Sequence, residues 1–133
     1  MKRKILVVDD EASIRELFST VFAEADYEVI AAEGGTQALK ILQLEDIDVI
    51  FLDLKLFGMN GIELCRQIRE TKPISIIYAM TGWAPLFEIE ESREAGFDDY
   101  FEKPLDMDML LNLVADSFAR LNRWRMRYNT LKA

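Results

Sequence analysis

The sequence contains a single cysteine, no histidine, and no run of 18 or more apolar residues of the kind that spans a bilayer. One cysteine rules out an internal disulfide bond. Cys65 falls with Leu64 and Ile68 on one side of a predicted helix, which indicates a buried structural thiol. The amino terminus passes directly from Met-Lys-Arg-Lys into an apolar segment and shows no cleavable signal pattern. We therefore expect a soluble, cytoplasmic protein without membrane insertion.

Length and charge set further limits. The 133 residues, half of them hydrophobic, suffice for one compact core and are too few for two ordinary domains. We expect one domain over residues 1–120 and an extension of its last helix over residues 121–133. Residues 117–133 carry five basic residues and no acid, so the remaining chain holds 24 acids against 11 basic residues, a charge of −13. An acidic body argues against direct nucleic-acid binding, and the basic end is interpreted as a solvated helix face, with phosphates or an acidic partner as the alternative.

Apolar strand-like runs alternate with segments of helical periodicity along the chain. Strands are predicted over residues 4–8, 27–32, 48–53, 74–79 and 98–101, each followed by a helical segment. Asn60 suits the N-cap of the third helix, Gly96 ends the fourth, and the last helix begins near Asp106. Five strand–helix units with short connections predict an α/β fold with a parallel sheet covered on both faces. We expect a flavodoxin-like, doubly wound sheet with strand order 2-1-3-4-5 and an extended C-terminal helix.

Acidic residues gather where two neighbouring strands of that sheet end. Asp53 closes an apolar run typical of a strand buried on both faces. Asp9 and Asp10 follow the first strand, which the expected order places beside the third. Taken alone, they are better explained as a helix N-cap. Together with Asp53 they form three clustered carboxylates, which repel one another unless a cation lies among them, and oxygen ligands of this kind suit Mg²⁺.

Two more polar residues leave the same edge of the sheet and favour the metal site over the simple cap. Thr81 is expected just after the fourth strand and Lys103 just after the fifth. A hydroxyl and an ammonium that face a metal-bound carboxylate form a place for a phosphoryl group, whose oxygens the metal, hydroxyl and lysine would share.

With these residues in place, the chain resembles the receiver domain of bacterial two-component response regulators over residues 3 to about 120. The matching segments are Ile-Leu-Val-Val-Asp9-Asp10-Glu11, Asp53 with Gly61 eight residues later, Thr81-Gly82, and residues 95–104. No single segment is specific, but their order and spacing together are.

The resemblance implies a role for each acidic residue. Asp53 would be the phosphoacceptor, Asp10 a direct Mg²⁺ ligand and Asp9 a ligand through water. The third protein ligand in the family is the backbone carbonyl two residues after the acceptor, which is that of Lys55 here.

The resemblance also extends to the opposite side of the site. Thr81 and Lys103 would hold the phosphoryl oxygens. Tyr100 matches the family's switch aromatic, which turns inward when the threonine moves toward the phosphoryl group. The simpler interpretation, an edge tyrosine half-buried in the fifth strand, is compatible with that role. Lys103-Pro104 resembles the family's cis peptide, which would aim the lysine into the site.

The implied mechanism is in-line attack by Asp53 on a phosphohistidine, with Mg²⁺ neutralising charge. Because the chain has no histidine, the donor must be a partner, either a sensor histidine kinase or a histidine phosphotransfer protein. The switched surface would then bind a downstream target. On this interpretation the chain is no enzyme, since it catalyses only its own phosphorylation and dephosphorylation.

Two other function classes fit parts of the sequence. An aspartate-nucleophile phosphatase of the haloacid dehalogenase type would want a second aspartate where Lys55 stands. A receiver-like scaffold that is never phosphorylated would not need all five site residues. The chain also departs from the family, because Phe57 replaces the usual proline and Trp83 stands where smaller residues are common. We expect Phe57 to be exposed and Trp83 to be either a lid or a surface ring.

The last helix is longer than the sheet requires, since 26 residues from Asp106 to Leu131 would extend roughly 39 Å at 1.5 Å per residue. One face carries a stripe with alternating spacings of four and three, at Leu110, Val114, Ser117, Leu121, Trp124, Tyr128 and Leu131. The stripe indicates either a helix-pairing seam or a face whose first half packs on the sheet. Aromatic residues among arginines are typical of contact surfaces, which favours a homodimer through this helix.

Overall fold

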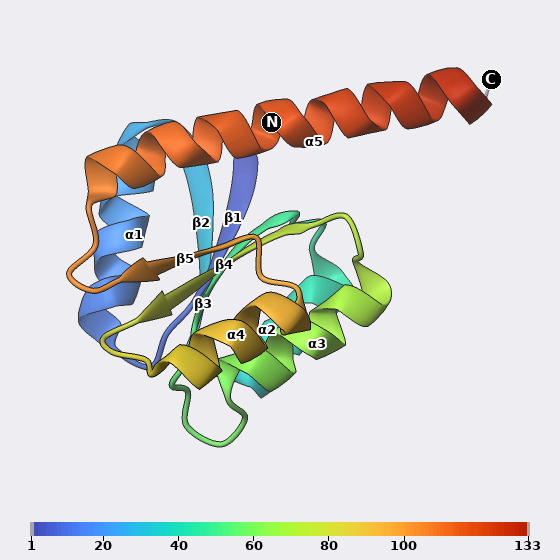
Figure 1. Cartoon of the computed structure of the whole chain (residues 1–133). Coiled ribbons are helices and arrows are strands. Elements are labelled where there is room, and N and C mark those ends of the chain that lie inside the picture. The colour runs from blue at the N-terminus through green and yellow to red at the C-terminus, as the bar shows by residue number, and fades with distance from the viewer. Residues whose placement is uncertain (1, 133) are drawn as a thin grey trace.

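The computed structural model describes residues 2–132. Its strands are β1 (Arg3–Val8), β2 (Tyr27–Ala32), β3 (Val49–Asp53), β4 (Ile76–Thr81) and β5 (Asp99–Glu102). They form one parallel sheet in the order β2-β1-β3-β4-β5 (Figure 1). The predicted fold class and strand order are confirmed.

Five helices cover the sheet, and they are α1 (Ala12–Glu24), α2 (Gly35–Leu44), α3 (Gly61–Thr71), α4 (Leu86–Ala95) and α5 (Met107–Lys132). Helices α1 and α5 lie on one face, and α2, α3 and α4 lie on the other (Figure 1). Because side chains alternate along a strand, each face has its own core. Leu52 of β3 packs toward α3, for example, and Phe51 packs toward α1. No helix within residues 2–132 combines the length and apolar character that a membrane span requires.

Local signals in the sequence place several element ends. The Asn60 side chain caps α3 by accepting a hydrogen bond from the Glu63 N–H at 2.8 Å. Gly96 ends α4 in the left-handed conformation, at φ +109°, where a residue without Cβ is favoured. Cys65 lies on the buried face of α3, as expected.

The fourth strand differs from its prediction. It begins at Ile76 instead of residue 74, because residues 72–75 form a turn in which both the N–H and the hydroxyl of Ser75 donate to the Lys72 carbonyl. The strand ends at Thr81. This residue was expected to follow the strand, and that placement was wrong, since Thr81 pairs with Glu102 inside the sheet.

Helix α5 covers the sheet with its first half and continues well beyond it (Figure 1). Leu110, Val114, Ser117 and Leu121 are buried, whereas every later residue of the helix is exposed. Ser117 interrupts the apolar stripe for a reason that the sequence did not reveal. Its Oγ lies 2.6 Å from the Tyr78 hydroxyl in the core and also donates to the Leu113 carbonyl at 2.7 Å.

Candidate functional site

Four carboxylates converge at the carboxyl ends of β1 and β3. Asp9, Asp10, Glu11 and Asp53 each offer an oxygen, and these four oxygens all lie within 4.8 Å of one another. The cluster forms because β1 and β3 are neighbours in register, with Val8 beside Leu52, so the residues that follow emerge together. The structure thus brings together the three aspartates that the sequence singled out. It adds Glu11. This residue directly follows Asp10, but no role was predicted for it from the sequence.

Asp53 lies at the centre of this cluster and is only 4% exposed. Its two carboxylate oxygens are oriented by different donors. Oδ1 accepts the backbone N–H of Lys55 at 2.9 Å, and Oδ2 accepts the ammonium of Lys103 at 2.9 Å. The carboxylate is therefore held in one orientation at the carboxyl edge of the sheet.

Lys103 is the one ammonium that reaches the cluster within the described part of the chain. It directly follows β5, where its N–H donates to the Thr81 carbonyl at 2.8 Å, and its peptide bond with Pro104 is cis as predicted. Its Nζ lies 2.9 Å from Asp9, 3.1 Å from Glu11 and 2.9 Å from Asp53. Burial alone would lower the pKa of Lys103, but the hydrogen bonds to these acids outweigh it and raise the pKa, so the side chain stays charged.

Asp9 is fully buried, and one of its oxygens is poorly satisfied. Oδ1 accepts the Glu11 N–H at 2.9 Å. Oδ2 forms a 2.9 Å ion pair with Lys103, but no group among residues 2–132 donates a well-aligned hydrogen bond to it. Burial raises the pKa of Asp9 to about 6, although the Glu11 N–H and Lys103 act in the opposite direction.

These donors fit a hard cation. All the converging atoms are oxygens, four carboxylates face one ammonium, and a buried carboxylate oxygen lacks an aligned donor. A divalent ion such as Mg²⁺ takes oxygen ligands of this kind and would offset the excess negative charge.

The threonine and tyrosine predicted for this site lie close to it but hold other partners. The buried Thr81 hydroxyl donates to the Trp83 carbonyl at 3.0 Å and accepts the Trp83 N–H at 3.2 Å. Tyr100 is half-buried in β5, and its hydroxyl donates to Glu102 at 2.9 Å on the surface. Their roles as phosphoryl ligand and switch stay predictions.

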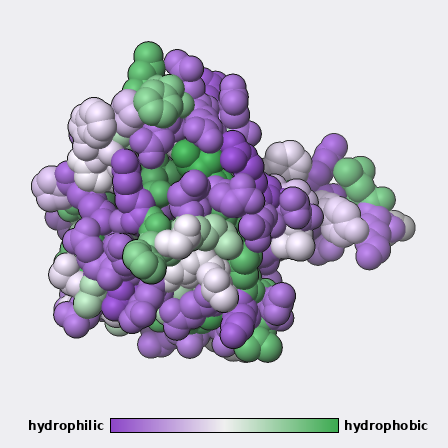
Figure 2. All heavy atoms as spheres, turned by 90° about the horizontal axis from the view of Figure 1, so that it is seen from below, coloured by the Kyte–Doolittle hydropathy of each residue, from purple (hydrophilic) through white to green (hydrophobic). Residues whose placement is uncertain are grey.

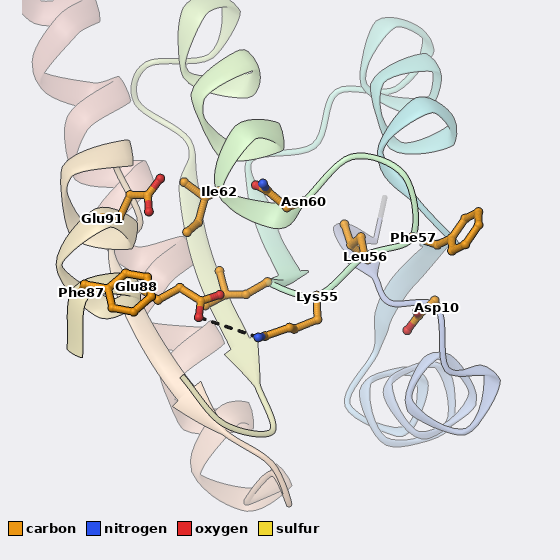
Figure 3. A pocket seen from close by; sticks show the side chains of 10 residues that line it. Asp10, Lys55, Leu56, Phe57, Asn60, Ile62, Phe87, Glu88 and Glu91 are labelled. Atoms are coloured by element: carbon orange, nitrogen blue, oxygen red, sulfur yellow. Dashed lines mark ion pairs between the residues drawn. The ribbon is translucent and has the colours of Figure 1, made fainter. Parts of the chain in front are cut away.

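A groove of about 590 Å³ opens beside the acidic cluster, between the β3–α3 loop and α4. Figure 3 shows Asp10 and Phe57 on one side of it and Phe87 and Glu88 on the other, with the Lys55 ammonium 3.8 Å from Glu88. Phe57 is 92% exposed, as expected. Trp83 is 69% exposed, as a surface ring would be. The role of the Lys55 carbonyl as a metal ligand stays a prediction.

Comparisons with known proteins agree with this geometry. A family model described as the response regulator receiver domain matches residues 5–115. Over 114 residues the chain is 38% identical to sporulation initiation phosphotransferase F of Bacillus subtilis, an alignment that covers 86% of this chain and 92% of that protein. Over 104 residues it is 41% identical to the alkaline phosphatase synthesis transcriptional regulatory protein PhoP of the same organism, covering 78% of this chain and 43% of that protein. The chain therefore spans nearly all of the first relative and less than half of the second.

The same likeness appears among solved structures. The response regulator receiver domain protein from Methanospirillum hungatei superposes with a TM-score of 0.88 at 27% identity, covering 92% of this chain and 98% of that one.

Proposed function

Because this chain belongs to the response regulator receiver domain family, and so serves as a phosphoacceptor module in two-component signalling, we propose that Asp53 is the residue that receives the phosphoryl group. One observation carries the proposal. The Asp53 carboxylate ends a buried strand at the centre of the acidic cluster, with Oδ2 on Lys103 and Oδ1 on a backbone N–H. Asp53 lies at the carboxyl edge of the sheet with its carboxylate already oriented to attack phosphorus. Positioning of this kind is a large part of catalysis in phosphoryl transfer.

The acidic neighbours of Asp53 are proposed as the cation site. Asp10 would bind Mg²⁺ directly, Asp9 through water, and the Lys55 carbonyl would complete the protein ligands together with Asp53. The chemistry that the ion supplies when bound is neutralisation of the charge on the phosphoryl oxygens.

The donor is proposed to be a phosphohistidine of a partner protein. Response regulators interact with sensor kinases and with downstream targets, and this chain has no histidine of its own. In the transfer, a bond forms between an Asp53 oxygen and phosphorus as the phosphorus–nitrogen bond to histidine breaks, and the nitrogen keeps the electron pair. The donor would be a sensor histidine kinase or a histidine phosphotransfer protein. On this proposal the chain catalyses no reaction other than its own phosphorylation and dephosphorylation.

Lys103 and Thr81 are proposed to receive the product. Lys103 already forms an ion pair with the Asp53 carboxylate. After phosphorylation its ammonium would pair with a negatively charged phosphoryl oxygen. Thr81 would have to exchange its two hydrogen bonds with Trp83 for one to the phosphoryl group. That exchange would move the β4–α4 loop beside Tyr100 and change the surface offered to a downstream target.

The test is phosphorylation of the full chain by acetyl phosphate with Mg²⁺, followed by intact and peptide mass spectrometry. We expect one added phosphoryl group on Asp53, no addition in Asp53→Asn, and no addition when the metal is chelated. Asp108→Asn serves as the matched control, because Asp108 is exposed at the start of α5. Stable phosphorylation of another residue in the wild-type chain, or an unchanged yield in Asp53→Asn, would refute the assignment.

A further inference from the structure

The part of α5 that extends beyond the sheet carries an exposed apolar stripe. Trp124, Tyr128 and Leu131 are 61%, 63% and 72% exposed. They continue the face that buries Val114 and Leu121 against the sheet, since they follow at helical spacings of three and four. Figure 2 shows this end of the helix standing clear of the body, with hydrophobic and hydrophilic residues side by side. We call residues 122–132 the arm.

The base of the arm contains a small hollow. Ile74 lies in the turn before β4 and is 61% exposed. Between it and the arm is a space of about 400 Å³, lined by Ile74, Trp124, Arg125, Tyr128 and Asn129. Two aromatic rings and a branched aliphatic side chain around one hollow form a receptor for an apolar side chain.

Ion pairs hold the arm, and the turn of α5 just before it, in this position. Arg120 lies 3.4 Å from Asp98. Arg125 pairs with Asp48, which is itself 3.1 Å from Lys72. Exposed pairs of this kind add little stability, but they orient the helix over the turn that carries Ile74. A surface that is already ordered loses less conformational entropy when a partner binds.

The charges beside the stripe indicate which partner fits. Arg123, Arg127 and Lys132 flank the stripe and have no ion pair with an acid of the body among residues 2–132. No acidic residue follows Asp116 in α5. Two copies that paired along their arms would bring these cations against one another, and like charges across an interface oppose binding.

A phosphate-rich surface fits less well for a different reason. Nucleic acid or an anionic bilayer would attract the arm but would also repel residues 1–116, which carry a charge of −13. A partner helix is smaller and carries its acidic residues only beside an apolar ridge. It can therefore contact the basic arm without bringing negative charge close to the acidic remainder of the chain.

We propose that the arm is the docking site for an acidic amphipathic helix of a partner protein. An apolar side chain of the partner fills the hollow between Ile74 and Trp124, and its Asp or Glu residues pair with Arg123, Arg127 and Lys132. The site lies at the amino ends of β3 and β4, opposite the end that carries Asp53, so a bound partner leaves the phosphorylation site open.

The test uses the full chain with Trp83→Phe, which leaves Trp124 as its one tryptophan. The ligand is a synthetic amphipathic helical peptide with a leucine ridge flanked by glutamates, and the same peptide with lysines is the comparison. We expect the glutamate peptide to shift Trp124 emission to the blue with an affinity that falls as salt rises, and the lysine peptide to have no effect.

Variants separate the contributions of charge and hollow. Arg123→Glu with Arg127→Glu should weaken binding about tenfold, because two exposed attractions become repulsions. Ile74→Ser should also weaken binding, because it removes an apolar side chain that lines the hollow. Arg93→Glu is the control, since Arg93 is exposed on α4, which covers the face of the sheet opposite α5. Circular dichroism checks that each variant is folded.

Several results would overturn the proposal. Absence of a shift with the glutamate peptide is one, and equal affinity of both peptides is another. Sedimentation velocity that shows arm-dependent dimers of the wild-type chain would assign the stripe to a second copy. Tighter binding of duplex DNA or of phosphatidylserine vesicles than of the glutamate peptide would assign it to phosphates.

Discussion

Gly61 begins α3 in direct contact with the strand end that carries Asp53. Its N–H donates to the Leu54 carbonyl at 3.0 Å. A Cβ added at this position would lie 2.2 Å from the Asp53 carbonyl oxygen and 2.8 Å from the Leu54 Cα. Both are backbone atoms, which cannot rotate away. To restore even the 3.0 Å that Cβ contacts require, Gly61→Ala must move the helix or the strand end by at least 0.8 Å.

This displacement has two expected effects. Overpacking of a buried site typically costs about 1–3 kcal/mol, and we expect Gly61→Ala to lower the free energy of unfolding by this amount. A misplacement of a reacting group by about 1 Å can cost about 100-fold in rate, and we expect phosphorylation by acetyl phosphate to slow toward that extent. Urea denaturation followed by circular dichroism measures the first effect, and quantitative mass spectrometry of the phosphorylated chain measures the second.

Gly82→Ala is the matched control, because a Cβ there would meet no atom within 4 Å. It should change the free energy of unfolding by no more than about 0.5 kcal/mol in the destabilising direction. The reasoning would be refuted if Gly61→Ala matched this control in both stability and phosphorylation rate, since the backbone contact would then have no consequence.

Three further predictions each concern a single side chain. Ser117→Ala should cost about 1–3 kcal/mol, because it leaves the buried Tyr78 hydroxyl unpaired, but less than about 0.5 kcal/mol in a Tyr78→Phe background; equal costs in urea denaturation would contradict the coupling. Burial raises the pKa of Cys65 from its ordinary value to about 11, so the thiol should resist iodoacetamide at pH 8 until the chain unfolds, and its contribution to stability should be present below pH 9 and lost as pH rises toward 11. Asp10→Ala should weaken Mg²⁺ binding at least about tenfold, because a charged ligand is lost, and an unchanged Mg²⁺ titration of Trp83 fluorescence would count against that role.

Local sequence determined the helices and strands and the position of Asp53. A continuous apolar run can be buried on both faces, which is why β3 was recognisable and why Asp53 was expected at its end. Asn60 and Gly96 marked helix ends because one supplies a capping oxygen and the other accepts a left-handed backbone. The strand-order rule for alternating βα units then sufficed to predict that Asp9 and Asp10 meet Asp53.

The individual hydrogen bonds and ion pairs between distant side chains were decided only by the tertiary structure. The expected strand order placed Lys103 at the same edge of the sheet as Asp53, 50 residues away, but it did not predict that the same ammonium also contacts Glu11, 92 residues away. Thr81 lies within β4 because it pairs with Glu102 of β5 and its carbonyl accepts the Lys103 N–H. A buried hydrogen bond to Tyr78 likewise explains Ser117.

In α5, too, the sequence determined one property and the tertiary structure another. Its stripe was readable from the sequence because residues three and four apart share one face of a helix. The sequence did not show at which residue the side chains of that stripe cease to be buried. Burial ends after Leu121, and Trp124 is exposed, because the sheet beneath the helix ends there. Periodicity determines which side chains lie on a common face, whereas the extent of the surface packed against that face decides which of them are buried and which remain open to a partner.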